Sequence, residues 1–161
     1  MDLISRISQH FTDSAQAKLK AIEALAAPLA GAVELMVGTL VDNGKILACG
    51  NGGSAADAQH FAAELVGRFE MERQGLTAIA LTTDSSIMTA VSNDYGYKAV
   101  FERQVRALGQ PGDLLLAIST SGNSPNVVEA IRAAHDNDLS VVALTGKGGG
   151  EIGRMLRDAD V

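Results

Sequence analysis

The chain changes character at Cys49-Gly50-Asn51-Gly52-Gly53-Ser54-Ala55-Ala56-Asp57-Ala58-Gln59-His60-Phe61-Ala62-Ala63-Glu64, where an apolar run gives way to a glycine turn and then to a helical pattern. The glycines permit a tight turn and a close backbone approach to a ligand, and Ser54 and Asp57 have the Ser-x-x-acid spacing of a helix start. His60 and Glu64 are four residues apart, so they lie on one helix face, one turn apart. A helix N-terminus that favours anions and a candidate metal or acid–base pair therefore share one element.

The bulk composition predicts a single soluble globular domain. The chain has 161 residues, of which 47% are hydrophobic and 20% charged, and it contains 17 glycines. No unbroken apolar run approaches the roughly 20 residues of a membrane span, and the N-terminus lacks the basic and apolar blocks of a signal peptide. We therefore expect a cytoplasmic protein that has no membrane partner.

Charge and cysteine content argue against two further classes. A net charge of −6, without a cluster of lysine and arginine, argues against broad binding to nucleic acid, so no nucleic-acid partner is expected. Cys49 is the single cysteine, which excludes an internal disulfide and suits a reducing compartment. Cys49 is either a small buried residue at a strand end, which is the usual case, or a nucleophile beside the glycine turn.

Two amphipathic helices are expected before any strand. The first spans residues 3 to about 25, and the second begins near Pro28 and ends near residue 43. Their apolar residues recur at helical spacing, at Leu3, Ile4, Ile7, Phe11, Ala15, Leu19, Ile22 and Leu25, then at Leu29, Val33, Met36 and Leu40. These stripes supply more apolar surface than is needed to cover one face of a small sheet. We therefore expect part of that surface to be buried against another subunit. The alternative is that these two helices only add packing to their own domain and make no subunit contact.

From residue 44 onward, apolar strands and helices alternate. Strands are expected at 46–48, 77–81, 113–118 and 139–144, with a fifth beginning at 159–161, and helices at 54–68, 84–91, 97–108, 126–137 and up to about 157. This alternation predicts a three-layer α/β sandwich around a five-stranded parallel sheet, with the flavodoxin-like order 2-1-3-4-5. We expect one domain over residues 1–161, made of an N-terminal helical segment (1–43) and an α/β core (44–161).

A second polar loop follows the third expected strand and reads Ser119-Thr120-Ser121-Gly122-Asn123-Ser124-Pro125-Asn126. In the order 2-1-3-4-5 the first and third strands are neighbours, so this loop faces the glycine turn where the strand order reverses. Its hydroxyls and backbone can donate to a phosphate without a cation. The competing explanation is a turn in which Ser124 caps the helix and Pro125 takes its first position, and the two interpretations are compatible.

Three other motifs fit less well. Gly50-x-Gly52-x-x-Ala55, with Asp84 after the second strand, formally matches the dinucleotide-binding fingerprint, but the match is degenerate and leaves the serine-rich loop unexplained. The run 146–150 lacks the Walker spacing and is better explained as a strand-to-helix loop. There is no Gly-x-Ser-x-Gly elbow for a serine nucleophile.

The histidines and carboxylates leave several roles open. Glu64, one turn from His60, could act as a general base or as half of a metal site, although zinc needs three or four protein ligands. His10 and His135 are expected on solvated helix faces without a role. The pair Asn93-Asp94 either forms a turn or reaches sugar hydroxyls.

A set of motifs spread over nearly the whole chain resembles one known family. The motifs are Cys49-Gly50-Asn51-Gly52-Gly53-Ser54, His60-x-x-x-Glu64, Gly67-Arg68-Phe69, Ser92-Asn93-Asp94-Tyr95-Gly96, Gly112-Asp113 and Ser119-Thr120-Ser121-Gly122-Asn123-Ser124. Together they resemble the sugar-isomerase (SIS) domain, and within it the sedoheptulose 7-phosphate isomerases. The resemblance implies a cytoplasmic homotetramer that holds Zn²⁺ and interconverts sedoheptulose 7-phosphate and D-glycero-D-manno-heptose 7-phosphate, toward the heptose of bacterial lipopolysaccharide.

The resemblance also implies a role for individual residues. Carried over by position, Ser119, Thr120, Ser121 and Ser124 hold the phosphate, Asn51, Gly52, Gly53 and Ser54 the substrate, and Asn93 and Asp94 its hydroxyls. His60 and Glu64 become zinc ligands, and Glu64 also binds substrate and acts as the base. An isomerase that moves a carbonyl between C1 and C2 needs such a base, and an acid or metal to stabilise the oxyanion.

The resemblance implies a further segment and also leaves one alternative. The family continues past a fifth strand into a long helix with a glutamine and a histidine that complete the zinc site and supply the acid, so we expect the natural protein to extend beyond Val161. The alternative function is a non-enzymatic SIS-domain adaptor that associates with the bacterial replication initiator. Such an adaptor has no need of Glu64, which is present here.

Overall fold

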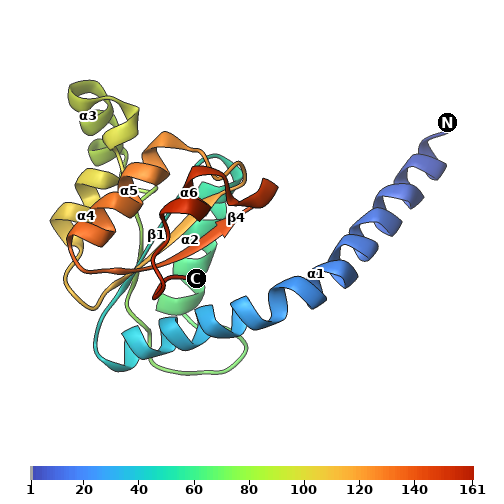
Figure 1. Ribbon diagram of the computed structural model, residues 1–161, viewed down its shortest axis with the longest axis horizontal. Coiled ribbons are helices and arrows are strands. Elements are labelled where there is room, and N and C mark those ends of the chain that lie inside the picture. Colours follow the sequence, from blue (N-terminus) through green and yellow to red (C-terminus); the bar gives the residue numbers. More distant parts are fainter. Residues whose placement is uncertain (1) are drawn as a thin grey trace. The chain divides into compact units, whose positions relative to one another are not determined.

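A parallel four-stranded sheet forms the centre of the protein. The computed structural model describes residues 2–161. Its strands are β1 (Ile46–Gly50), β2 (Ala78–Ala80), β3 (Leu114–Ser119) and β4 (Ser140–Thr145), in the order β2-β1-β3-β4 (Figure 1). The pairing places Leu47 beside Leu115 and Leu115 beside Val141. The strand order therefore reverses between β1 and β3, as the flavodoxin-like order predicted.

Helices cover both faces of the sheet and give the three expected layers. Helix α2 (Gly53–Val66) packs on one face, while α4 (Glu102–Leu108), α5 (Pro125–Asp136) and α6 (Gly150–Met155) lie on the other. Helix α3 (Ser85–Tyr95) and the 3₁₀ turns η1 (Tyr97–Ala99) and η2 (Lys147–Gly149) connect them. The sequence predicted one helix over 97–108, which the structure divides into η1 and α4.

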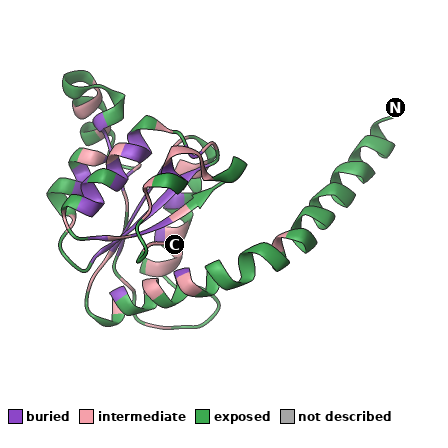
Figure 2. Cartoon of the chain, viewed as in Figure 1, coloured by how far each residue is buried: buried purple, intermediate pink, exposed green. Residues whose placement is uncertain are grey.

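Alternation of side chains along the inner strands explains why two helical layers are needed. Leu47, Cys49, Leu115 and Ala117 point into the core under α5, and all five residues of β1 are buried. The intervening side chains point toward α2. Figure 2 shows the buried residues concentrated along the sheet and on the inner side of α5. A strand that is buried on both faces reads as a continuous apolar run, which is why β1 and β3 were predictable.

The expected fifth strand is wrong within the described residues. The sheet of residues 2–161 has four strands, and the segment that contains Asp160 is irregular. Among these last residues only Val161 pairs with β4 through its backbone: its N–H donates to the Val141 carbonyl at 3.0 Å, and its carbonyl accepts from the Ala143 N–H at 2.7 Å. One residue that pairs in this way is too short to form a strand.

The two expected N-terminal helices are one continuous helix, α1 (Leu3–Val41), of 39 residues. Pro28 lies inside it. Proline removes one backbone hydrogen bond of a helix, but the alanines on its N-terminal side are strong helix formers that favour continuation. The prediction was wrong because proline in the first turn of a helix and proline within a helix leave the same apolar pattern around them.

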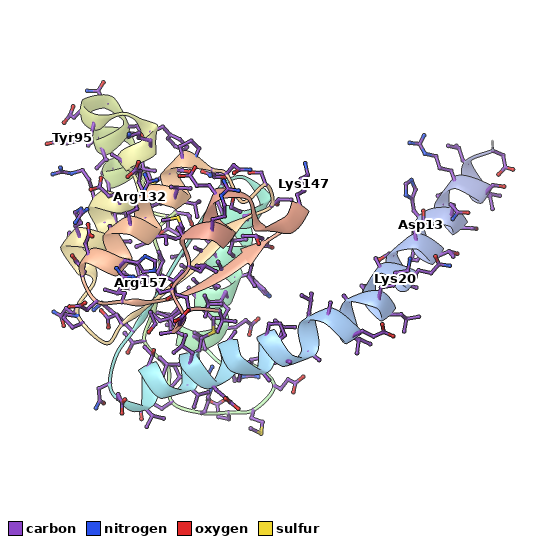
Figure 3. All side chains as sticks on the ribbon, in the orientation of Figure 1. Asp13, Lys20, Tyr95, Arg132, Lys147 and Arg157 are labelled. Carbon is purple, nitrogen blue, oxygen red and sulfur yellow. The ribbon has the colours of Figure 1, made fainter. Side chains whose placement is uncertain are left out.

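By contact density the chain divides into two compact units, Met1–Glu34 and Leu35–Val161. The first unit is the N-terminal part of α1, whose apolar side chains are exposed, and charged residues such as Asp13 and Lys20 project from the same helix (Figure 3). By length and composition α1 would also pass for a membrane span, with an 18-residue window of mean hydropathy 1.8. Charged residues interrupt α1, so it contains no unbroken apolar run of the length that the sequence criterion required. One such helix is weak evidence, since helices of soluble proteins meet the same criteria.

His135 is buried, which corrects the expectation that it lies on a solvated helix face. Its Nε2 lies 2.8 Å from the Asp160 carboxylate, and both side chains are almost completely covered. Asp160 also accepts hydrogen bonds from the backbone N–H groups of Val141 and Arg157. The last residues of the described chain cover this histidine, and the helical pattern of α5 alone gave no sign of that.

Candidate active site

The glycine turn after β1 is shaped by backbone constraints. Gly52 is the N-cap of α2 with φ of +56°, a conformation that glycine adopts without strain. A side chain at Gly50 would collide with the backbone of Ser54. The Ser54 and Asp57 capping pair does not form, because the helix begins at Gly53 and no side chain caps it. The first turn of α2 is therefore left without a capping side chain and faces the end of the sheet.

The serine-rich loop after β3 gathers the predicted phosphate-binding hydroxyls. Ser119 ends β3, and Ser124 occupies the N-cap position of α5. The Ser124 hydroxyl makes no capping hydrogen bond and instead lies 2.9 Å from the Ser119 hydroxyl. Ser121 Oγ accepts from the Asn123 N–H, and Thr120 is exposed. Two of the four hydroxyls thus contact each other, and all four lie ahead of a helix N-terminus, a position that favours anions.

The structure brings the glycine turn and the serine-rich loop together at the reversal of strand order. Gly50 pairs with Ile118 in the sheet, so the two loops leave adjacent strands at the same edge. The side chains of Asn51 and Asn126 then form a reciprocal pair, in which each amide nitrogen donates to the other amide oxygen at 2.8 Å. The predicted juxtaposition of these loops is confirmed.

The loop after β4 supports the serine-rich loop from behind. The N–H of Gly146 in this loop and that of Ile152 in α6 donate to the carbonyls of Thr120 and Gly122, and a Cβ at Gly122 would collide with the Gly149 carbonyl. The Lys147 side chain extends outward from this loop (Figure 3). The loop therefore acts as a backbone support, in agreement with its interpretation as a strand-to-helix connection.

His60 and Glu64 lie side by side on α2, as their spacing predicted. His60 Nε2 is 3.5 Å from Glu64 Oε1, and the two side chains are 78% and 35% exposed. They line an open hollow of about 370 Å³ together with Asp57, Phe61, Phe69, Leu116, Ile118 and Leu144. Arg73 fixes the end of α2 here by donating to the Glu64 carbonyl at 2.7 Å and to the Leu65 carbonyl at 2.9 Å. The serine-rich loop does not line this hollow.

The geometry of this pair fits part of a zinc site. Zinc–nitrogen and zinc–oxygen bonds of about 2.0–2.1 Å in a tetrahedron place neighbouring ligand atoms roughly 3.3 Å apart. The 3.5 Å separation of His60 Nε2 and Glu64 Oε1 is close to that value. Among residues 2–161 no group of three histidine, cysteine, aspartate or glutamate side chains could hold a metal. The described chain thus offers two side chains whose spacing is compatible with zinc ligation.

Asn93 and Asp94 lie on the last turns of α3, where Asn93 Nδ2 donates to Asp94 Oδ1 at 2.8 Å and both residues are exposed. Their side chains bond to each other, and the segment meets the glycine turn through Tyr97, whose hydroxyl donates to Asn51 Oδ1 at 3.1 Å. The sequence prediction named the pair and missed this tyrosine.

Two competing interpretations lose their support. Cys49 is fully buried, and burial raises the pKa of its thiol to about 12, which is the opposite of what a nucleophile needs. Asp84, the candidate ribose-binding acid, is the N-cap of α3 and accepts from the Ile87 N–H at 2.9 Å. A capping role accounts for Asp84 without a dinucleotide.

Comparison with known proteins identifies the family. The SIS domain model matches residues 10–146. The phosphoheptose isomerase of Aromatoleum aromaticum is 70% identical over 161 residues, which are all of this chain and 81% of that protein. That of Dechloromonas aromatica is 66% identical over 161 residues, again all of this chain and 82% of that protein. The chain belongs to the phosphoheptose isomerase family of SIS domains.

A solved structure of the phosphoheptose isomerase family has the same fold. The structure of phosphoheptose isomerase GmhA from Neisseria gonorrhoeae superposes with a TM-score of 0.95 at 56% identity, covering 99% of this chain and 84% of that one. The matched part includes α1, so this helix belongs to the family fold. These family members are longer than the chain described here, which spans about four fifths of their length.

Three residues near the phosphoheptose isomerase motifs were missed by sequence reasoning. Asn126, Tyr97 and Arg73 all make contacts that join separate segments of the site. Asn126 stood inside the quoted serine-rich loop, and Tyr97 two residues after the quoted Tyr95, so their neighbourhood was visible. Their partners are 75 and 46 residues distant in sequence, and no local pattern reveals them.

Proposed function

We propose that the protein is an aldose–ketose isomerase that interconverts sedoheptulose 7-phosphate and D-glycero-D-manno-heptose 7-phosphate. The observation that carries the proposal is the 66–70% identity to phosphoheptose isomerases over the entire chain. The facing glycine turn and serine-rich loop give a sugar phosphate a place to bind. The named relatives favour this isomerase over the adaptor that associates with a replication initiator.

The phosphate is assigned to the serine-rich loop. Ser119, Thr120, Ser121 and Ser124 provide hydroxyl donors, and the N-terminus of α5 adds the positive end of its dipole. No lysine or arginine is needed, because a phosphate can be bound by hydroxyls and backbone N–H groups alone. The sugar itself is assigned to Asn51, Gly52, Gly53 and Ser54, and its hydroxyls to Asn93 and Asp94.

The proton transfer is assigned to Glu64. Moving the carbonyl between C1 and C2 requires a base that removes a proton from one carbon and returns it to the other through an enediol. Glu64 is partly exposed in an open hollow, so its carboxylate is accessible to a substrate. The polarised carbonyl needs an electrophile as well, because negative charge develops on its oxygen.

Zinc is the proposed cofactor, with His60 and Glu64 among its ligands. The 3.5 Å spacing of these two side chains supports the assignment. When bound, zinc would supply Lewis-acid polarisation of the carbonyl oxygen. The remaining ligands and the partner acid are proposed to come from a further helix beyond Val161, and the relatives, which are longer than this chain, leave room for one.

Assembly and location complete the proposal. A cytoplasmic homotetramer is proposed from the family resemblance, and the exposed apolar side chains of α1 support association of subunits. In the cell the reaction would feed the synthesis of the heptose of bacterial lipopolysaccharide.

The decisive experiment is an isomerase assay on the full-length protein with zinc, comparing wild type with Glu64→Gln. The glutamine keeps the size of the side chain but cannot accept the proton, so we expect kcat to fall by about 10²–10⁴-fold. Glu72→Gln is the matched control, because Glu72 is an exposed carboxylate in an ion pair with Arg68. Its activity should equal that of wild type. Equal rates in wild type and Glu64→Gln would refute the assignment of the base, and an inactive wild type would refute the isomerase.

A further inference from the structure

We infer that Tyr97 and Asn126 are positioning residues that hold the Asn51 side chain as a hydrogen-bond donor toward the sugar phosphate. The inference rests on the proposed function, because it assigns a task to residues that flank the proposed substrate site. It adds two residues that no motif marked, and it specifies which half of the Asn51 amide meets the substrate.

The Asn51 side-chain amide uses most, but not all, of its hydrogen-bonding capacity within the protein. A side-chain amide oxygen has two lone pairs, and its nitrogen has two hydrogens. Asn51 Oδ1 accepts from Asn126 Nδ2 at 2.8 Å and from the Tyr97 hydroxyl at 3.1 Å, so both lone pairs are used. Asn51 Nδ2 donates one hydrogen to Asn126 Oδ1 at 2.8 Å. Its second N–H has no protein acceptor among residues 2–161, and it is the part of the amide that remains for a ligand.

Asn126 and Tyr97 hold the Asn51 side-chain amide in place. Asn126 is 2% exposed, and its amide would lose its partners if Asn51 rotated away. A buried polar group without a hydrogen bond is costly, so this pair resists rotation. The Tyr97 hydroxyl donates to the same Asn51 oxygen at 3.1 Å and adds a second contact that restrains the amide.

Asn51, Asn126 and Tyr97 come from three different segments of the fold. Asn51 belongs to the glycine turn after β1, Asn126 to the first turn of α5 behind the serine-rich loop, and Tyr97 to η1, just after the end of α3. These are the segments assigned to the sugar, the phosphate and the sugar hydroxyls. One amide therefore holds three parts of the proposed site in register.

The exposure of Tyr97 distinguishes a positioning role from a structural one. Tyr97 is 55% exposed. A hydrogen bond at such a position contributes little to folding, because water replaces it in the unfolded chain. Loss of the Tyr97 hydroxyl should therefore appear in ligand binding and not in stability.

The test is a double-mutant cycle of Tyr97→Phe and Asn51→Ala in the full-length protein. We expect Tyr97→Phe to raise KM for sedoheptulose 7-phosphate about 3- to 10-fold, the effect of one neutral hydrogen bond. We expect kcat to change by less than about twofold, because uniform binding is lost. In the Asn51→Ala background the same change should have no further effect, since Tyr97 acts only through Asn51. The melting temperature should shift by less than about 2 °C.

Tyr95→Phe is the matched control, because Tyr95 is 56% exposed and its ring lies under the Arg103 guanidinium. It should leave KM unchanged. The inference is overturned if the Tyr97 and Asn51 effects add independently, or if Tyr97→Phe behaves like Tyr95→Phe. Calorimetric binding of the sugar phosphate is measured in parallel. A wild type that binds without turnover refutes the proposed isomerase while the coupling is still read in Kd, and a wild type that does not bind refutes both.

Discussion

Cys49 lies one residue before the end of β1, fully buried beneath α5, and its thiol shows how a single core residue can make stability depend on pH. Burial disfavours the charged thiolate, which raises the pKa of the thiol from 9.0 to about 12. Below pH 9 the thiol is neutral in the folded and the unfolded chain, so its contribution is complete there. As the pH rises from 9 toward 12, only the unfolded chain ionises, and the folded state loses stability.

The prediction is that the free energy of unfolding of wild type falls by up to about 1.4 kcal/mol per pH unit above pH 9 relative to Cys49→Ala. All other titratable groups are common to both proteins and cancel in the comparison. Urea unfolding at pH 8, 9.5 and 10.5 measures the difference. Parallel curves for the two proteins would mean that the thiol ionises as readily in the fold as in the unfolded chain.

Single residues of the site were predictable as members of motifs, but their partners were not. The glycines of the turn and the hydroxyls of the serine-rich loop were recognised because local spacing demands those residue types. Capping of α5 by Ser124 was the competing explanation for this loop, and its hydroxyl instead lies beside that of Ser119. Such choices between a local and a tertiary partner depend on side chains that arrive from other elements, which a local pattern does not contain.

Elements were predictable where burial is uniform and less so where the chain ends or bends. β1 and β3 are covered on both faces, so their apolar runs left little ambiguity. α1 was divided at Pro28 because proline is more common at helix starts. The expected fifth strand depends on pairing beyond β4, and only Val161 makes it within the described residues.

The Asp160 carboxylate makes several of the contacts that hold the segment Arg157–Val161 to the core. It accepts from the Val141 N–H at 2.9 Å and from the Arg157 N–H at 2.8 Å, and it pairs with His135. Its side chain is almost fully buried, so replacing it leaves these donors without an acceptor. Asp160→Ala in the full-length protein should therefore cost roughly 2–4 kcal/mol of unfolding free energy.

Hydrogen exchange provides the local measurement of the same change. The amides of Ala143 and Val161 are bonded across the junction between β4 and this segment, and they should exchange faster in Asp160→Ala. Asp158→Ala is the control, because Asp158 is exposed two residues away and should leave both amides protected. Unchanged protection in Asp160→Ala would show that the segment is held by other contacts.

At the scale of the whole molecule, the apolar surface of α1 needs an explanation that one chain does not provide. Ile4, Phe11, Leu19 and Ile22 are each more than 60% exposed, although their spacing is that of a buried helix face. Figure 2 shows the helix exposed over most of its length. The proposed homotetramer accounts for this surface, because association would remove these side chains from water.

Ile22→Asp tests this account in the full-length protein. Burying one isoleucine is worth about 1.5–3 kcal/mol, and an unpaired carboxylate in its place costs more, repeated in every subunit. We expect the mass measured by light scattering at about 10 µM to fall from four subunits to two or one. Lys20→Glu is the control, since Lys20 lies on the opposite helix face and should leave the mass unchanged. A tetramer that survives Ile22→Asp would place the subunit contacts away from this face of α1, and an identical loss in Lys20→Glu would attribute the effect to charge alone.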